Sequence, residues 1–146
     1  MNLDAEWAQV AEALAELTGA GLLAITELAA PTLSELRRAL LHDTYHVLHY
    51  MGHGGFDQEH GETLLFTDPA VRGVPVTGSD LGVMLRDHTS MRLAVLNACP
   101  AGRTDPEGPF AGVSDTLVRR GIPAVIAMQF EITDTAAVEF APALYG

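Results

Sequence analysis

The sequence predicts an α/β fold, a three-layer sandwich in which helices cover both faces of a mostly parallel sheet. Short apolar runs typical of buried strands alternate along the chain with amphipathic helical patterns, as in such sheets. Hydrophobic residues make up 48% of the chain and charged residues 18%, which is enough apolar character for a folded core. At 146 residues the chain has the length of one ordinary domain, and we expect a single domain over residues 1–146.

The first third of the chain predicts two helices with a strand between them. Apolar residues recur at helical spacing over residues 4–17, and Asp4 stands where an N-cap would lie. The apolar run at residues 22–26 predicts a buried strand. Thr32 and Glu35 have the spacing of a capping box, in which each side chain accepts a backbone N–H at the start of a helix.

Residues 45–51 predict a strand that leads into a glycine turn, Gly-His-Gly-Gly, at residues 52–55. The histidines here could instead line one face of a helix, because they are spaced by four, three and four residues. These histidines are His42, His46, His49 and His53. The glycines and aromatic residues among them disfavour a helix, so the strand is the preferred interpretation.

Two short β segments at residues 62–66 and 73–77 are separated by Asp-Pro, which predicts a hairpin. Ser79 or Asp80 is then expected to cap a helix.

The second half of the chain continues the alternation. Residues 91–96 predict an apolar strand with Cys99 just beyond its carboxyl end. Residues 110–118 predict a helix that stops at Gly121, and residues 122–128 predict another strand.

A loop rich in glycine, proline and aspartate is expected at residues 100–109. The last helix should open at Thr133 or Asp134, and Pro142 should kink or end it.

Charge and composition exclude several classes of function. The net charge of −11 would repel a phosphate backbone, so we expect no nucleic-acid partner. No apolar stretch approaches the ~20 residues that cross a bilayer, and the first residues show no basic n-region with an apolar h-region, so we expect neither a membrane span nor secretion. The single cysteine cannot form an intrachain disulfide, and we expect a cytoplasmic protein with no membrane partner.

Two residues indicate nucleophilic catalysis. His53 and Cys99 each follow a predicted strand, and functional groups of open α/β sheets gather at the carboxyl ends of strands. They are 46 residues apart, close to the spacing of the caspase histidine and cysteine. A nearby imidazole gives a thiol the thiolate character that makes sulfur nucleophilic. The amide of Gly54 could point at a developing oxyanion.

The chain also carries a set of motifs in a fixed order. They are His49-x-x-Gly52-His53-Gly54, Asn97-Ala98-Cys99, Phe110-x-Gly112-Val113 and the run from Gly121 to Phe130, Gly-Ile-Pro-Ala-Val-Ile-Ala-Met-Gln-Phe. In this order, over nearly the whole chain, they resemble the CHAT family, caspase-like domains often found in multidomain bacterial proteins. The resemblance implies a caspase-hemoglobinase-like fold, shared with separases and caspases, and a Cys-His dyad.

The resemblance implies a role for each matching residue. Cys99 would be the nucleophile and His53 the general acid/base, with the amides of Gly54 and Cys99 forming the oxyanion hole. The implied substrate pocket consists of Asn97, Gln129 and Phe130, and the implied supporting residues are His49 and Gly52.

The implied function is a cysteine endopeptidase domain that acts on a protein or peptide substrate without metal or organic cofactor, as part of a longer parent protein. Two departures keep an alternative open. Pro100 follows the cysteine where relatives commonly have an acidic residue, and related domains continue past Gly146, so the chain is interpreted as a fragment truncated at its C-terminus. The alternative is a catalytically silent caspase-like interaction or regulatory module.

A metal site is disfavoured, and so is a pocket for aspartate. His46 and His49 would point to opposite faces of a strand and could not share a metal with His53. A pocket for an aspartate side chain needs a basic floor, of which the sequence offers little. The acidic candidates Asp57, Glu131 and Asp134 favour cleavage after a basic or neutral residue.

Overall fold

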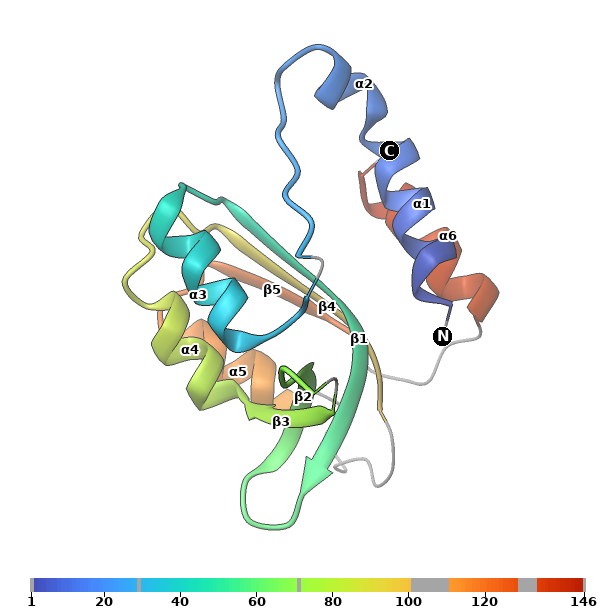
Figure 1. Ribbon diagram of the computed structural model, residues 1–146. Coiled ribbons are helices and arrows are strands. Elements are labelled where there is room, and N and C mark those ends of the chain that lie inside the picture. The colour runs from blue at the N-terminus through green and yellow to red at the C-terminus, as the bar shows by residue number, and fades with distance from the viewer. Residues whose placement is uncertain (1, 29, 71, 101–110, 129–133, 146) are drawn as a thin grey trace. The chain divides into compact units, whose positions relative to one another are not determined.

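The computed structural model describes residues 2–28, 30–70, 72–100, 111–128 and 134–145 (Figure 1). The chain divides into two compact units. Residues 1–27 and 132–146 form one, here called the helical unit, and residues 28–131 form the other, the sheet unit.

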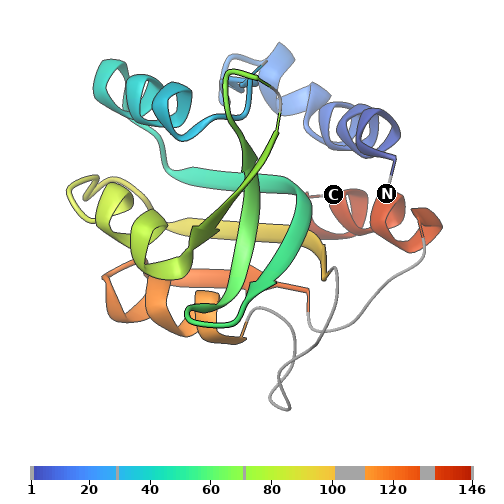
Figure 2. The same ribbon diagram turned by 60° about the horizontal axis from the view of Figure 1, so that its bottom comes forward.

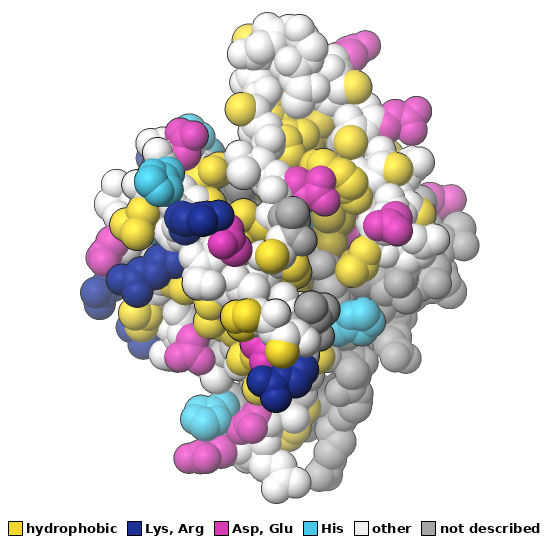
Figure 3. All heavy atoms as spheres, in the orientation of Figure 1, with side chains coloured by type: hydrophobic (Ala, Val, Ile, Leu, Met, Phe, Trp, Pro, Cys, Tyr) yellow, Lys and Arg dark blue, Asp and Glu magenta, His cyan; other side chains and the backbone are white. Residues whose placement is uncertain are grey.

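The helical unit contains α1 (Leu3–Ala13), α2 (Ala15–Gly19) and α6 (Asp134–Tyr145), and α1 packs against α6. The cap of α1 differs from the prediction, because the side-chain oxygen of Asn2, and not of Asp4, accepts the N–H of Ala5 at 3.1 Å. In sequence this unit carries seven acidic residues and no basic one: Asp4, Glu6, Glu12, Glu16, Glu27, Asp134 and Glu139. Figure 3 shows acidic and apolar side chains over α1 and α2.

The strand predicted at residues 22–26 is also wrong. Residues 22–26 lie in no helix or strand, and Leu22 is 77% exposed. A strand needs a neighbour for its backbone groups, and the described part of this unit offers none. Pro142 lies inside the last helix, which continues to Tyr145, so it does not end the helix, and the alternative of a kink stays a prediction. The position of Thr133 lies outside the described residues.

The sheet unit is built on five strands in the order β3-β2-β1-β4-β5 (Figures 1 and 2). The strands are β1 (Val47–Asp57), β2 (Gly61–Thr67), β3 (Gly73–Thr77), β4 (Leu93–Pro100) and β5 (Ala124–Ala127). β1, β4 and β5 are parallel, whereas β2 and β3 are antiparallel, as the predicted hairpin requires. The sheet is therefore mixed, with its parallel strands together, and coverage of both faces stays a prediction.

β1 corrects the prediction of a glycine turn at residues 52–55. The strand continues through all four residues and ends at Asp57. β1 pairs with β4 from Val47 to Gly54 and with β2 from Gly54 to Asp57, and these ladder contacts override the local preference of glycine for a turn. The chain turns later, where Gly61 adopts φ +75°. In the same way β4 extends to Pro100, so Cys99 lies within the strand and not beyond it.

Three helices complete the unit: α3 (Leu33–His42), α4 (Gly78–Leu85) and α5 (Ala111–Arg119). Thr32 caps α3 as predicted, but the Glu35 carboxylate pairs with Arg38, so only half of the capping box forms. The cap of α4 is Thr77, two residues before Ser79 and three before Asp80, the predicted caps. Its hydroxyl accepts the N–H of Asp80 at 3.0 Å and the Asp80 carboxylate accepts the N–H of Thr77 at 3.2 Å, a complete capping box.

The three helices share one hydrophobic core with alternate residues of the strands. The helices contribute Leu36, Leu40, Leu81, Leu85, Val113 and Leu117, and the strands contribute Tyr50, Leu64, Phe66, Val76, Ala94, Leu96 and Ala98. α5 ends as predicted at Gly121, where φ is +100° and the N–H of Ile122 donates to the carbonyl of Leu117 at 3.1 Å. No helix in the described ranges has the length and apolar character that a membrane span requires.

Candidate active site

The register of β1 against β4 makes His53 and Cys99 partners in the parallel ladder. Neighbouring strands lie about 4.8 Å apart, so the two backbones are adjacent at these positions. The His53 side chain is exposed. For Cys99 the structure describes the backbone.

Gly54 is the point at which β1 changes its partner. Its Cα is paired with Leu64 of β2 on one side and with Pro100 of β4 on the other. Up to this residue β1 follows β4, and after it β1 follows β2 towards the hairpin. The residue is buried.

Tyr50 reaches the backbone of His53 from the core. Its hydroxyl lies 2.8 Å from the carbonyl oxygen of His53 and 2.8 Å from that of Leu65, as a donor to either one. Its ring packs against Phe66 with the centroids 5.4 Å apart. Sequence reasoning missed this residue because an aromatic side chain in a strand predicts core packing. The one local signal is the glycine at position 52, which leaves the hydroxyl its space.

His49 lies in β1 as the ladder partner of Val95. Burial lowers the pKa of its imidazole from 6.5 to about 4, because a buried site disfavours the charged form. The ring is therefore neutral at neutral pH. A neutral imidazole fits the supporting role expected for it, which stays a prediction.

Of the three residues expected to form the substrate pocket, the structure describes Asn97. Asn97 lies in β4 opposite Met51, and its side chain is 1% exposed. Gln129 and Phe130 lie outside the described residues.

The acidic candidates fall in different parts of the chain. Asp57 closes the β1–β2 turn, where its Oδ1 accepts the N–H of Glu59 at 2.9 Å and that of His60 at 2.8 Å and lies 2.9 Å from Nδ1 of His60. This contact raises the pKa of His60 and lowers that of Asp57. Asp134 belongs to the helical unit, and Glu131 lies outside the described residues.

Glu62 joins β2 to the start of α5. Its Oε2 accepts the N–H of Gly112 at 3.1 Å, in the first turn of the helix that follows Cys99 along the chain. A carboxylate at a helix N-terminus satisfies a free donor and interacts favourably with the helix dipole. The start of α5 is thus tied to the strand that pairs with β1.

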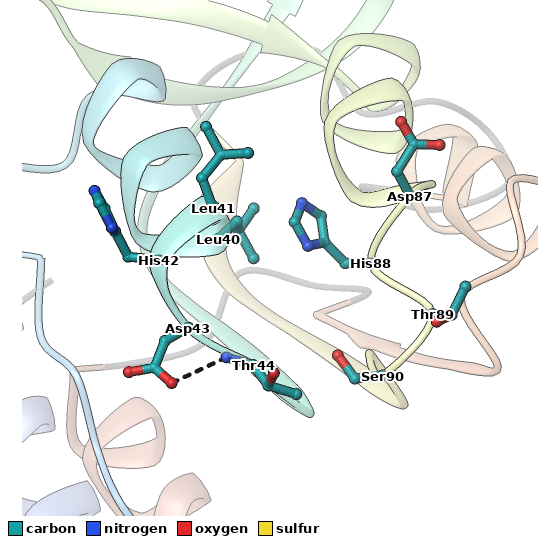
Figure 4. A pocket seen from close by; sticks show the side chains of 9 residues that line it. All are labelled: Leu40, Leu41, His42, Asp43, Thr44, Asp87, His88, Thr89 and Ser90. Carbon is teal, nitrogen blue, oxygen red and sulfur yellow. Dashed lines mark hydrogen bonds between the residues drawn. The ribbon is translucent and has the colours of Figure 1, made fainter.

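A second polar region lies at the opposite, amino end of β1 and β4. It is an open cavity of about 510 Å³ between the end of α3 and the connection from α4 to β4 (Figure 4). Its lining includes His42, Asp43, Asp87 and His88. The His88 ring lies beside Leu40, whereas the His42 ring lies on the other side of α3 (Figure 4). Among the side chains that the structure describes, no three metal-binding groups converge.

A comparison with known protein families matches the CHAT domain over residues 2–146. The match includes both units and every residue discussed above. A search of curated proteins finds no match.

Proposed function

We propose that this chain, which belongs to the CHAT domain family, is a caspase-like cysteine endopeptidase with Cys99 as nucleophile and His53 as general acid/base. CHAT domains are caspase-like, and a peptidase-like fold is in keeping with the family. The observation that carries the proposal is the pairing of His53 with Cys99 in the β1–β4 ladder.

The ladder supports a dyad because residues in register on parallel strands carry their side chains on the same face of the sheet. With the backbones about 4.8 Å apart, a thiol and an imidazole on one face can come within the hydrogen-bond distance that proton transfer needs. His53 is exposed and thus open to a substrate. Pro100, the next residue, lacks an N–H and can add no further donor for the oxyanion, and this departure from the family pattern favours the silent alternative.

The reaction follows from these positions. The Cys99 sulfur, deprotonated by His53, attacks the carbonyl carbon of a peptide bond, and the amides of Gly54 and Cys99 donate to the oxyanion. His53 then transfers its proton to the leaving amine as the C–N bond breaks. A water molecule, activated by His53, hydrolyses the thioester and restores the thiol.

We propose that the residue before the cut is basic or neutral, bound by a pocket of Asn97, Gln129 and Phe130. An aspartate there would need a basic partner, since burying an unpaired carboxylate is costly. A peptide library that varies this residue tests the preference, and dominant cleavage after aspartate would overturn it.

Alkylation of the single thiol tests the dyad. Iodoacetamide should modify Cys99 faster than an unperturbed thiol, and His53→Ala should slow the reaction, because the imidazole promotes the thiolate. His46→Ala is the matched control, an exposed histidine just before β1. Equal rates in the wild-type chain and in both variants, with no peptide cleaved, would instead favour a catalytically silent interaction module.

A further inference from the structure

The β1–β2 ladder ends in a fork at which the hydroxyl of Tyr50 is placed. The last antiparallel pair is Gly54 with Leu64, and the next in the same register would be His53 with Leu65. The carbonyl oxygens of these two residues each lie 2.8 Å from the Tyr50 hydroxyl. The hydroxyl therefore lies where the next backbone pair of the ladder, His53 with Leu65, would otherwise form.

The surroundings of Tyr50 suit a fixed donor. The side chain is 9% exposed and its ring packs on Phe66. Burial raises the pKa of its hydroxyl, with the two carbonyl contacts as opposing smaller influences, so the proton is retained. A retained proton means that the group can always donate to one of the two carbonyls.

Gly52 provides the space for this hydroxyl. A Cβ at position 52 would lie 2.6 Å from the Tyr50 oxygen and 2.8 Å from the ring carbon that carries it. No real Cβ tolerates such distances, so any larger residue would displace the tyrosine. Tyr50 and Gly52 lie two residues apart on the same face of β1, and the hydroxyl keeps its position only because residue 52 has no side chain.

We propose that Tyr50 is a positioning residue for the oxyanion hole, acting through the peptide that joins His53 to Gly54. A trans peptide is planar, and its carbonyl and its N–H point in opposite directions. Tyr50 holds the His53 carbonyl on the side of β2, so the Gly54 N–H is directed to the other neighbour of β1. That neighbour is β4, in which Cys99 is the ladder partner of His53. This role rests on the function proposed above.

Tyr50→Phe removes the hydroxyl and keeps the ring against Phe66. We expect the backbone ¹³C shifts of the His53 and Leu65 carbonyls to move, because the hydroxyl that lies against both, and donates its proton to one of them at a time, is gone. The matched control is Tyr45→Phe, which removes a hydroxyl just before the other end of β1 and should leave both shifts unchanged. Unchanged shifts in Tyr50→Phe would overturn the proposed contact, whatever the activity of the chain.

Two thiol reagents separate positioning of the oxyanion hole from a general loss of structure. The peptide aldehyde acetyl-Leu-Leu-argininal forms a tetrahedral adduct that needs the oxyanion hole, whereas alkylation by iodoacetamide forms no oxyanion. Loss of one oxyanion donor costs ~10²- to 10³-fold, so misdirecting it should weaken the aldehyde at least about tenfold. Tyr50→Phe should show this loss with the alkylation rate unchanged, and Gly52→Ala, which displaces the hydroxyl, should also weaken the aldehyde.

The outcomes distinguish this role from the proposed function. If the wild-type chain binds the aldehyde and Tyr50→Phe binds it equally well, the positioning role alone is wrong. If the wild-type chain forms no adduct and cleaves no peptide, the endopeptidase proposal fails and the role falls with it. A chain with 4-aminophenylalanine at position 50 keeps a donor at the same place. It should bind the aldehyde like the wild type, and failure to do so in a folded protein would also overturn the role.

Discussion

The two ends of the parallel strands β1 and β4 differ in what they offer for chemistry. The amino end has the open cavity of about 510 Å³, with two histidines and two aspartates in its lining. The carboxyl end has a single exposed histidine beside the backbone of Cys99, with a tyrosine fixing the peptide after it. Under the proposed function the reactive residues are the two that the ladder holds in register, and the hollow surrounded by titratable side chains has no part in catalysis.

The physical difference is in what holds the side chains. At the amino end they come from the end of a helix and from connections, and bonds such as that from the Thr44 N–H to Asp43 Oδ1 are local. At the carboxyl end the ladder sets the distance between His53 and Cys99 before any side chain moves. Precise reactive geometry is best built on such rigid elements.

The largest expected effect separates the two ends by activity. Cys99→Ser and His53→Ala should lower kcat/KM for a cleaved peptide by at least ~10²-fold, because general acid–base transfer alone contributes about that much. His88→Ala, at the amino end, should leave kcat/KM unchanged. Steady-state kinetics on one coumarin-labelled peptide measure these values. An equal loss in His88→Ala would mean that the two ends do not differ in their contribution to activity.

The next effect separates the ends by stability. Leu64, the ladder partner of Gly54, is 0% exposed, and Leu64→Ala should lower the free energy of unfolding by about 2–5 kcal/mol through the cavity it leaves. Leu41, in the lining of the amino-end cavity, is 72% exposed, and Leu41→Ala should change it by less than about 0.5 kcal/mol. Urea titrations of both variants measure the contrast. Similar values would mean that the carboxyl end is not the better packed one.

A third effect is the pH dependence that His49 gives to stability. Its folded pKa of about 4 lies below the unfolded value of 6.5, so the unfolded chain binds more protons between these values. Stability should be full above pH 6.5 and fall as the pH drops towards 4, by at most about 3 kcal/mol. His49→Gln should flatten this part of the curve of unfolding free energy against pH. A curve unchanged by the substitution would assign the dependence to other groups.

The smallest expected effect comes from the tip of the β1–β2 hairpin. There the pH dependence of stability has the opposite sign to that of His49, because the pKa of His60 is raised and not lowered. Asp57 raises the pKa of His60, so this contact stabilises the fold below the unfolded pKa of the histidine, and the stabilisation is lost as the pH rises through the folded pKa. Asp57→Asn should lower the pKa of His60, measured by NMR titration of its ring protons. Since both side chains are exposed, the melting temperature should barely move. An unshifted titration curve would show that the contact does not persist in solution.

The sequence predicts the positions of His53 and Cys99 better than the structure around them. Each is expected at the carboxyl end of an apolar run, and the two runs do become neighbouring parallel strands, but that adjacency is a property of the sheet order and not of the sequence. The turn expected at residues 52–55 is wrong, because the preference of glycine is local and the two ladders on either side of β1 are not.

Other features depend on contacts that no local pattern contains. The run at residues 22–26 has the composition of a strand but no strand beside it in its unit. Tyr50 has a hydrogen-bond acceptor 15 residues away, at a fork whose place is set by the register of β1 with β2. Register is a tertiary property, so the function of that hydroxyl could not be predicted from its neighbours.

The two ladders of β1 also differ in the order in which the chain can form them. The hairpin with β2 first joins Asp57 to Gly61, whereas the parallel ladder joins His53 to Cys99 across 46 residues. Closing a long loop loses more chain entropy than closing a hairpin, which forms in roughly 1–10 μs. We therefore expect the β1–β2 hairpin, which contains His53, to form first, and His53 to lie beside Cys99 only after β4 has paired with β1. If the imidazole activates the thiol as proposed, the alkylation rate at position 99 should rise only when the β1–β4 ladder has formed, and it would report on closure of the sheet.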